Sequence, residues 1–409
     1  MHGLAEWLRA SRDARARALS GCLERVRALE PSLHAWACVE PQPSTGSGPL
    51  DGIPFGVKDI IDTKDLATEY GSPVYAGRRA AGDAAIVSHL RQIGAVLMGK
   101  THTAAFAYRT PAPTRNPRDP GRTPGGSSSG SAAAVAAGMV PLALGTQTQG
   151  SVLRPASYCG IAGFKPTYGL FPMEGVLLMA TSLDTLGFFT ATAADMLAFW
   201  EALGHDAGDD GAIEFGVPEP SPEVDPPMAA AFDAAVSRLR DAGVSILAVP
   251  LGDMPERLNE ASRVVMCYEG ARAHDERYRE HGSRLADLAD LVLEGRGVSG
   301  QDYREALACI AECRIRVAAF HARTPVILLP AATGPAPAGL ASTGDPRMNA
   351  PWTALGTPAI AIPMGAWQGL PLGLQLVAAC GDDGRLLRAA SRVERVLSLV
   401  SAWPRTRRT

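Results

Sequence analysis

Hydrophobic and polar positions along the chain follow two patterns, short apolar runs typical of buried strands and longer stretches with helical periodicity. The apolar runs predict strands at 33–39, 52–61, 94–99, 139–144, 213–217, 244–249, 326–329, 359–363 and 374–378. The helical periodicity predicts helices at 1–30, ending before Pro31, and at 84–93, 132–138, 193–204, 228–242 and most of 255–322, with a break at 295–300. Between Ser151 and Thr190 the pattern indicates only short strands and turns. This alternation of strands and helices predicts an α/β fold, a single large α/β/α sandwich around a twisted mixed sheet.

The 409 residues show no internal repeat, so we expect one domain over 1–409. A stretch rich in Gly, Pro and Asp surrounds a single predicted strand at 204–227. This is where a seam between two subdomains is expected.

Composition excludes several classes of partner. The chain is 46% hydrophobic and 20% charged with a formal net charge of −3, which predicts a substantial core and argues against nucleic acid or an anionic membrane as a partner. No apolar run has the length of a membrane span, and the first residues lack the apolar core of a secretory signal. The seven cysteines are scattered without a CxxC or a Cys/His metal spacing. We therefore expect a reducing, cytoplasmic location and no membrane.

The stretch Thr123–Ala156 organises the rest of the chain. Its first part, Gly125 to Ser131, contains three glycines and four serines, a density usual for a flexible linker. However, no charged residue occurs between Ser127 and Gln149, and the stretch continues directly into apolar segments. A loop between buried elements must satisfy its own backbone groups, so the sequence favours a shaped loop inside the fold.

Several ordered motifs resemble those of the amidase signature family. Together they span roughly residues 50 to 390, and they are Gly52-Ile53-Pro54-Phe55-Gly56-Val57-Lys58-Asp59, Gly125-Gly126-Ser127-Ser128-x-Gly130-Ser131, Gly-Thr-x-Thr-x-Gly-Ser ending at Ser151, Cys159-Gly160, Gly163-Phe164-Lys165-Pro166-Thr167, Ser182-x-Asp184, Gly356-x-Pro358 and Gly369-Leu370-Pro371-x-Gly373-Leu374-Gln375-Leu376. Within the family the chain is most similar to the malonamidase type, on the basis of Thr146-Gln147-Thr148, Arg154 and Ser342-Thr343-Gly344-Asp345-Pro346-Arg347.

A nucleophilic serine needs a base to accept its proton. None of the eight histidines falls in a nucleophile elbow or a recognisable triad, and only His102 lies near a motif, so a Ser-His-Asp hydrolase is unsupported. Lys58 is the other candidate base. At the end of an apolar run it could be a surface lysine with a buried stem, or a buried lysine with a lowered pKa that accepts a proton at neutral pH.

The resemblance implies the roles of the site residues. Lys58 would be the base, Ser127 would relay the proton after a cis peptide bond that follows Gly126, and Ser151 would attack the carbonyl to form an acyl-enzyme. The turn Thr148-Gln149-Gly150-Ser151 would offer backbone N–H groups to the oxyanion.

Two positions depart from the family pattern. Gln149 stands where relatives mostly have glycine, and its N–H can serve only if the turn does not demand positive φ. We interpret it as altered specificity rather than lost activity. Arg154 lies three residues after Ser151, whereas many relatives have arginine two after, where Leu153 stands here. It could clamp a substrate carboxylate, as in the malonamidase subgroup, or form an internal ion pair with Asp184 or Asp59, and the sequence leaves both open.

The other polar residues of the motifs have supporting roles in this interpretation. Asp59 and Asp184 would stabilise the site from outside it. Ser128, Ser129 and Ser131 would bond loop backbone and cap the helix that follows.

The sequence therefore predicts an amidase that hydrolyses a small primary amide, including one that bears a carboxylate, to acid and ammonia without cofactor or metal. The alternatives are a glutaminase-type subunit of a tRNA-dependent amidotransferase, which needs a partner and an ammonia tunnel, and a hydrolase of ureides such as carboxybiuret or allophanate. A catalytically weakened binding or biosynthetic protein is a further alternative, motivated by Gln149. The resemblance also implies a homodimer.

Overall fold

A single mixed sheet forms the centre of the molecule. The computed structural model describes residues 1, 3–208, 211 and 213–398, and within them eleven strands pair in the order β1-β3-β2-β4-β6-β5-β10-β11-β9-β7-β8. The strands are β1 (Trp36–Gln42), β2 (Pro54–Lys58), β3 (Val96–Thr101), β4 (Leu142–Gln147), β5 (Ala162–Lys165), β6 (Thr185–Thr190), β7 (Phe215–Pro218), β8 (Ile246–Val249), β9 (Val326–Pro330), β10 (Ala359–Trp367) and β11 (Leu370–Ala378).

The sheet combines parallel and antiparallel pairing, as predicted. β2 runs parallel to both β3 and β4, and β7 runs parallel to β8 and β9. The strands between these two groups pair antiparallel, and β10 and β11 form a hairpin. The strands β7 and β8 continue the same sheet beyond β9, and a seam at 204–227 stays a prediction.

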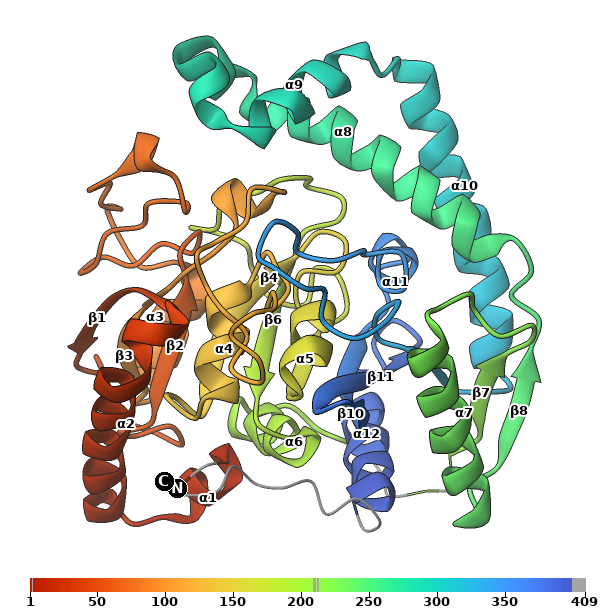
Figure 1. Cartoon of the computed structure of the whole chain (residues 1–409), viewed down its shortest axis with the longest axis horizontal. Coiled ribbons are helices and arrows are strands. Elements are labelled where there is room, and N and C mark those ends of the chain that lie inside the picture. The colour runs from red at the N-terminus through yellow and green to blue at the C-terminus, as the bar shows by residue number, and fades with distance from the viewer. Residues whose placement is uncertain (2, 209–210, 212, 399–409) are drawn as a thin grey trace.

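Helices cover both faces of the sheet (Figure 1). The helices are α1 (Leu4–Arg9), α2 (Arg12–Leu33), α3 (Ala85–Gln92), α4 (Ser129–Ala136), α5 (Leu153–Cys159), α6 (Ala193–Ala202), α7 (Pro226–Asp241), α8 (Met254–His281), α9 (Asp287–Gly297), α10 (Gly300–His321), α11 (Ala350–Ala354) and α12 (Asp383–Ser398). Successive strand residues point to opposite faces. In β5, Gly163 lies against Ala156 of α5, whereas the ring of Phe164 packs edge-on against Trp200 of α6, at 6.0 Å between centroids. The sheet is therefore the middle layer of an α/β/α sandwich.

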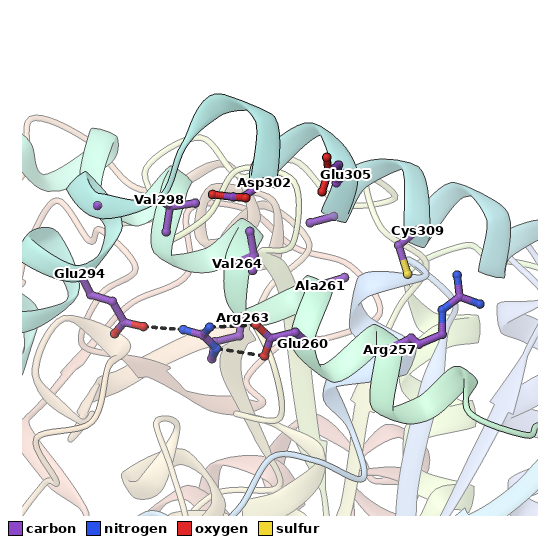
Figure 2. Close-up of a pocket in the computed structure, with 12 residues that line it drawn as sticks. Arg257, Glu260, Ala261, Arg263, Val264, Glu294, Val298, Asp302, Glu305 and Cys309 are labelled. Atoms are coloured by element: carbon purple, nitrogen blue, oxygen red, sulfur yellow. Dashed lines mark hydrogen bonds and ion pairs between the residues drawn. The ribbon is translucent and has the colours of Figure 1, made fainter.

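The long helices α8 and α10 and the shorter α9 form an arm that rises beside β7 and β8 and reaches over the upper edge of the sheet in Figure 1. An open groove of about 790 Å³ lies along this arm, and Figure 2 shows Arg263 in it bonded to Glu260 and Glu294. None of the residues predicted for catalysis lines this groove. No helix among the described residues combines the length and apolar character that crossing a bilayer requires.

Three local predictions are wrong. Helix α2 does not end before Pro31 but includes it and continues to Leu33. Proline there removes only a bond of the last turn, and the left-handed His34 closes the helix by donating its N–H to Glu30 O at 3.0 Å.

The second error lies between Ser151 and Thr190, where helix α5 follows the predicted turn almost immediately. Pro155 falls in the first turn of this helix, where its missing N–H is tolerated. The strand after α4 also begins later than predicted, at Leu142.

Candidate active site

The predicted site residues come from neighbouring parallel strands and from the loop before α4. Lys58 is the last residue of β2, and Ser151 follows the end of β4. Because β2 and β4 are parallel neighbours, the segments after them leave the sheet at the same edge. Ser127 lies just before α4, which packs against both strands. The fold thus brings the three motifs of the sequence together.

Lys58 is completely buried, so the surface interpretation of this lysine is wrong. Its Nζ lies 2.8 Å from Ser127 Oγ, 2.8 Å from Thr146 Oγ1 and 3.5 Å from Thr146 O. Burial lowers the pKa of Lys58 to about 7, although the negative charge of Asp184 favours the ammonium form. No carboxylate forms an ion pair with it within the described chain. Near neutral pH a large fraction of this amine is therefore uncharged.

Ser127 is held by its backbone as well as by its hydroxyl. The Gly126–Ser127 peptide is cis, as the family resemblance implies. The Ser127 carbonyl accepts hydrogen bonds from Ala104 N–H and from the Thr103 hydroxyl, both at 3.1 Å. These contacts fix the residue whose hydroxyl meets Lys58.

Ser151 lines a cavity of about 160 Å³ and is only 9% exposed. Ser127 lines the same cavity, which is formed by Ala107, Tyr108, Arg109, Ser127, Thr148, Gln149, Gly150, Ser151, Arg154, Met179, Met266, Thr343, Gly344 and Pro346. The hydrogen bonds of the described residues include the one between Lys58 and Ser127 but none between the two serine hydroxyls. Of the two contacts in the predicted relay, the structure contains the one between Lys58 and Ser127 but not a hydrogen bond between the hydroxyls of Ser127 and Ser151.

The turn at 148–151 meets the condition set for an oxyanion hole. Gln149 is not among the non-glycine residues of the described chain with positive φ, so glutamine fits this turn without strain. The backbone N–H groups of Gln149, Gly150 and Ser151 donate no hydrogen bond within the described residues. They are thus available to a developing oxyanion.

Asp184 anchors this turn from outside the cavity. It accepts hydrogen bonds from the Thr148 hydroxyl at 2.5 Å and from the N–H groups of Met179 at 2.5 Å and Ala180 at 3.0 Å. Burial raises the pKa of Asp184 to about 6, although these three donors stabilise its charged form. Asp184 therefore supports the site without lining the cavity.

Arg154 lines the cavity and is only 4% exposed. Its Nη2 donates to Gly126 O and its Nε to Thr343 O, both at 2.7 Å. The third nitrogen, Nη1, has no hydrogen-bond partner within the described residues. Asp59 instead pairs with Lys100 at 3.3 Å, and Asp184 has the partners given above. The alternative of an internal ion pair between Arg154 and Asp59 or Asp184 is therefore wrong.

The remaining candidates behave in simpler ways. His102 is not among the residues that line the cavity. The hydroxyls of Ser128, Ser129 and Ser131 donate to the carbonyls of Thr146, Gly125 and Leu144, so they are loop hydrogen-bonding groups as predicted. The predicted helix cap is absent at Ser128, whose side chain makes no capping bond to the described helix α4.

Sequence reasoning missed several residues of the site. Thr146 contacts Lys58, and its place just before Ser151 in a matched motif is a signal that could have found it. Met266 reaches the cavity from α8, and no local pattern marks it as part of the site, whereas Thr343 reaches it from the loop before α11 and belongs to a motif of the sequence. Among the described residues, no three side chains of metal-binding types gather in one place.

A mixed sheet of this kind, with a serine-lined cavity beside a buried lysine, is the architecture of an amidase-type hydrolase. The chain belongs to the amidase signature family, whose sequence model, described as Amidase, matches residues 35–387.

Similar proteins include amidotransferase subunits and amidases. The chain is 32% identical to a glutamyl-tRNA(Gln) amidotransferase subunit of Chloroflexus aurantiacus, over 94% of this chain and 93% of that protein. It is 34% identical to an amidase of Pseudomonas putida, over 82% of this chain and 79% of that protein. The crystal structure of the corresponding glutamyl-tRNA(Gln) amidotransferase subunit from Thermotoga maritima superimposes with a TM-score of 0.84 at 27% identity, covering 98% of this chain and 95% of that one.

Proposed function

We propose that this protein is an amidase that hydrolyses a small, carboxylate-bearing primary amide to an acid and ammonia through an acyl-enzyme on Ser151. The observation that carries the proposal is the buried Lys58. It bonds the Ser127 hydroxyl at 2.8 Å, lacks a carboxylate partner in the described chain, and has a pKa lowered to about 7. A buried lysine of this kind beside a serine-lined cavity is suited to general base catalysis.

In the first step, Ser151 Oγ attacks the amide carbon while its proton passes to Ser127 Oγ, and the proton of Ser127 passes to Lys58 Nζ. The neutral amine has one lone pair and two N–H groups. Thr146 O can only accept a hydrogen bond, so one N–H is directed towards it and the lone pair is left for a hydroxyl. Hydrogen bonds between catalytic groups are often long before substrate binds, which is consistent with a second link that forms only with substrate.

The tetrahedral intermediate then carries its negative charge on the former carbonyl oxygen. The unused N–H groups of Gln149, Gly150 and Ser151 are the donors that we assign to this oxygen. The proton on Lys58 returns through Ser127 to the leaving nitrogen, the C–N bond breaks, and ammonia departs. Water attacks the ester on Ser151 by the same route in reverse, which releases the acid.

Arg154 supports the choice of a carboxylate-bearing substrate. Arg154 lines the cavity of about 160 Å³, and the buried Nη1 of its guanidinium has no hydrogen-bond partner within the described residues, which favours a small anionic ligand. Gly150 makes room for this nitrogen, because a Cβ at that position would lie only 2.7 Å from Arg154 Nη1. The same chemistry suits the anionic ureides, which therefore belong in the test.

Ammonia release from matched amides tests this proposal. The panel contains malonamate, its neutral analogue malonamide, the ureide allophanate, and glutamine. We expect malonamate to be cleaved, Ser151→Ala to be inactive, and Arg154→Ala to lose about 30- to 150-fold in kcat/KM on malonamate, since a charge-assisted hydrogen bond contributes about 2–3 kcal/mol. Because Arg154 also holds Gly126 and Thr343, the decisive quantity is the ratio of the two losses. Equal losses on malonamate and malonamide would contradict the carboxylate clamp, and no turnover of any amide by the folded protein would contradict the amidase.

A glutaminase-type amidotransferase subunit is a second candidate, favoured by the similarity to the Chloroflexus aurantiacus protein over 94% of this chain. A larger cleft of about 750 Å³ shares Arg109, Gln149, Met266 and Pro346 with the active-site cavity, so it offers a route from Ser151 to a partner surface. Preference for glutamine in the panel, together with a large gain in turnover on addition of partner subunits, would favour this candidate.

The homodimer and the cytoplasmic location belong to the amidase proposal as well. Size-exclusion chromatography with light scattering measures the first directly. A stable, fully active homodimer of this chain alone would argue for the amidase and against a protein that requires partner subunits.

A further inference from the structure

Four uncharged side chains form a buried hydrogen-bond network behind the turn that carries Ser151. Gln147, Asn349 and Gln375 are completely buried, and Thr353 is 1% exposed. Gln147 lies at the end of β4, Thr353 in α11, Asn349 just before α11, and Gln375 in β11. The network thus connects the nucleophile turn to β11, which lies further along the same sheet.

Gln147 holds the chain just after Ser151. Its Oε1 accepts hydrogen bonds from Val152 N–H at 2.8 Å and Leu153 N–H at 3.1 Å. These two N–H groups lie at the start of α5, where a helix has no carbonyl partners of its own to offer. A single side chain therefore fixes the first two peptides that follow the nucleophile.

The other end of the same amide reaches Thr353. Gln147 Nε2 donates to Thr353 Oγ1 at 2.9 Å, so the threonine hydroxyl proton must go elsewhere. The Thr353 hydroxyl lies 2.8 Å from Gln149 O and 3.3 Å from Asn349 O. The shorter of these contacts is the one to the turn.

This contact fixes the orientation of one oxyanion-hole donor. In a trans peptide the C=O of one residue and the N–H of the next point in opposite directions. Because the Gln149 carbonyl points towards Thr353, the Gly150 N–H points away from Thr353. Gly150 lines the cavity and Thr353 does not, so the N–H is directed to the cavity side.

Thr353 is itself held in place. Asn349 Nδ2 donates to Gln375 Oε1 at 2.6 Å and to Ala331 O at 2.9 Å, and Gln375 Nε2 donates to Met348 O at 3.0 Å. The start of α11 is thereby tied to β11. Asn349 Oδ1 accepts no hydrogen bond within the described residues, so the donating amide nitrogens of Asn349 and Gln375 hold this part of the network together.

We propose that Gln147 and Thr353 are positioning residues that set the direction of the Gly150 N–H in the oxyanion hole. The inference rests on the proposed amide hydrolysis for its chemistry, but its geometry does not depend on which amide is the substrate. Gln147 suits the role because an amide can donate to Thr353 and accept from α5 at once, whereas a carboxylate can only accept.

Replacement of Thr353 by valine tests the proposal, since valine keeps the shape and removes the hydroxyl. Loss of an oxyanion-hole donor lowers kcat by about 10²- to 10³-fold, and a donor that is misdirected rather than deleted should lower it by about 10- to 100-fold. We expect this loss in kcat with KM and the pH midpoint unchanged, and recovery to within about threefold in Thr353→Ser. Gln147→Glu keeps the acceptor and loses the donor, so it should lower kcat in the same way.

Thr357→Val is the matched control. The Thr357 hydroxyl is also buried and donates to Trp352 O at 3.0 Å in the same segment, without touching the turn. Thermal melting of each variant reports whether it folds. Unchanged kcat in Thr353→Val, an equal loss in Thr357→Val, or a loss only in KM would each overturn the proposal.

A second readout separates this inference from the identity of the substrate. Phosphonylation of Ser151 by a small fluorophosphonate, followed by intact mass, uses the same N–H groups and requires no amide substrate. If no amide in the panel is cleaved but Thr353→Val slows phosphonylation and Thr357→Val does not, the positioning role stands while the proposed function fails. If the wild-type protein cleaves an amide, and Thr353→Val and Thr357→Val both react with the fluorophosphonate at the wild-type rate, the positioning role is overturned.

Discussion

Lys58 and Lys100 are two fully buried lysines on neighbouring strands with contrasting surroundings. Lys58 ends β2, and Lys100 lies beside Val57 in the parallel partner β3, so the two side chains point to opposite faces of the sheet. Lys58 meets the hydroxyls of Ser127 and Thr146. Lys100 forms an ion pair with Asp59 at 3.3 Å and donates to Ile61 O and to the Thr68 hydroxyl.

The comparison shows that two buried lysines can differ in the partners that surround them. Burial lowers the pKa of both groups, to about 7 for Lys58 and about 8 for Lys100, where the negative charge of Asp59 opposes the shift. A carboxylate neighbour holds Lys100 as a cation that organises the loop after β2. Hydroxyl neighbours leave Lys58 able to exchange a proton with Ser127.

The largest expected contrast is in activity. Lys58→Met removes the proposed base and should lower kcat/KM by about 10⁴-fold or more, as loss of a member of a catalytic unit commonly does. Lys100→Met, assayed per folded molecule, should stay within about threefold of wild type. Ammonia release under identical conditions measures both. Comparable losses in the two variants would remove the distinction between them.

The next contrast is in the free energy of unfolding, where the two substitutions are expected to have effects of opposite sign. Lys100→Met leaves Asp59 buried without its cation, which should destabilise the fold by about 3–5 kcal/mol. Lys58→Met deletes a buried amine and leaves no carboxylate without its ion-pair partner, so it should stabilise the fold by about 1–2 kcal/mol. Denaturant titration at pH 7 measures both values. Adding Asp59→Asn to Lys100→Met should recover part of the loss, and no recovery would contradict the ion-pair explanation.

The pH dependence gives a third contrast. If neutral Lys58 is the base, kcat/KM should fall about tenfold per pH unit below pH about 7 and be level above it. For stability, the folded-state pKa lies below the ordinary value of 10.5, so the unfolded chain binds more protons between pH about 7 and 10.5. The free energy of unfolding should therefore rise with pH across this window, and less so in Lys58→Met. A flat activity profile between pH 5 and 8 would contradict the assignment of the base.

The smallest effect concerns the hydroxyls around Lys58. Thr146→Val removes the contact at 2.8 Å from Nζ but keeps the backbone carbonyl. We expect kcat/KM to fall about 3- to 10-fold, in keeping with the net contribution of about 1 kcal/mol for one hydrogen bond. Steady-state kinetics with Thr148→Val as a comparison would separate this effect from that of the turn. A loss as large as that of Lys58→Met would show that Thr146, rather than Ser127, is the partner that matters.

The sequence predicted the alternation of strands and helices and the meeting of Lys58, Ser127 and Ser151, because each of these residues is marked by a local motif. The burial of Lys58 could not be predicted, since it depends on α4 covering the end of β2. Met266 was missed because only the long-range path of the chain brings α8 to the cavity. Helix α5 was missed because its N-terminus is stabilised by the side chain of Gln147 rather than by a capping residue next to it.

The small cavity around Ser151 and the larger cleft beside it place different limits on the size of an inhibitor. A ligand confined to about 160 Å³ around Ser151 has few non-hydrogen atoms, and the best small ligands gain at most about 1.5 kcal/mol per atom. Tight inhibitors of this protein are therefore expected to capture Ser151 covalently or to grow past Gln149 into the 750 Å³ cleft. Selectivity among related enzymes would come from the second route, because that cleft is lined mainly by loops and by α8 of the helical arm.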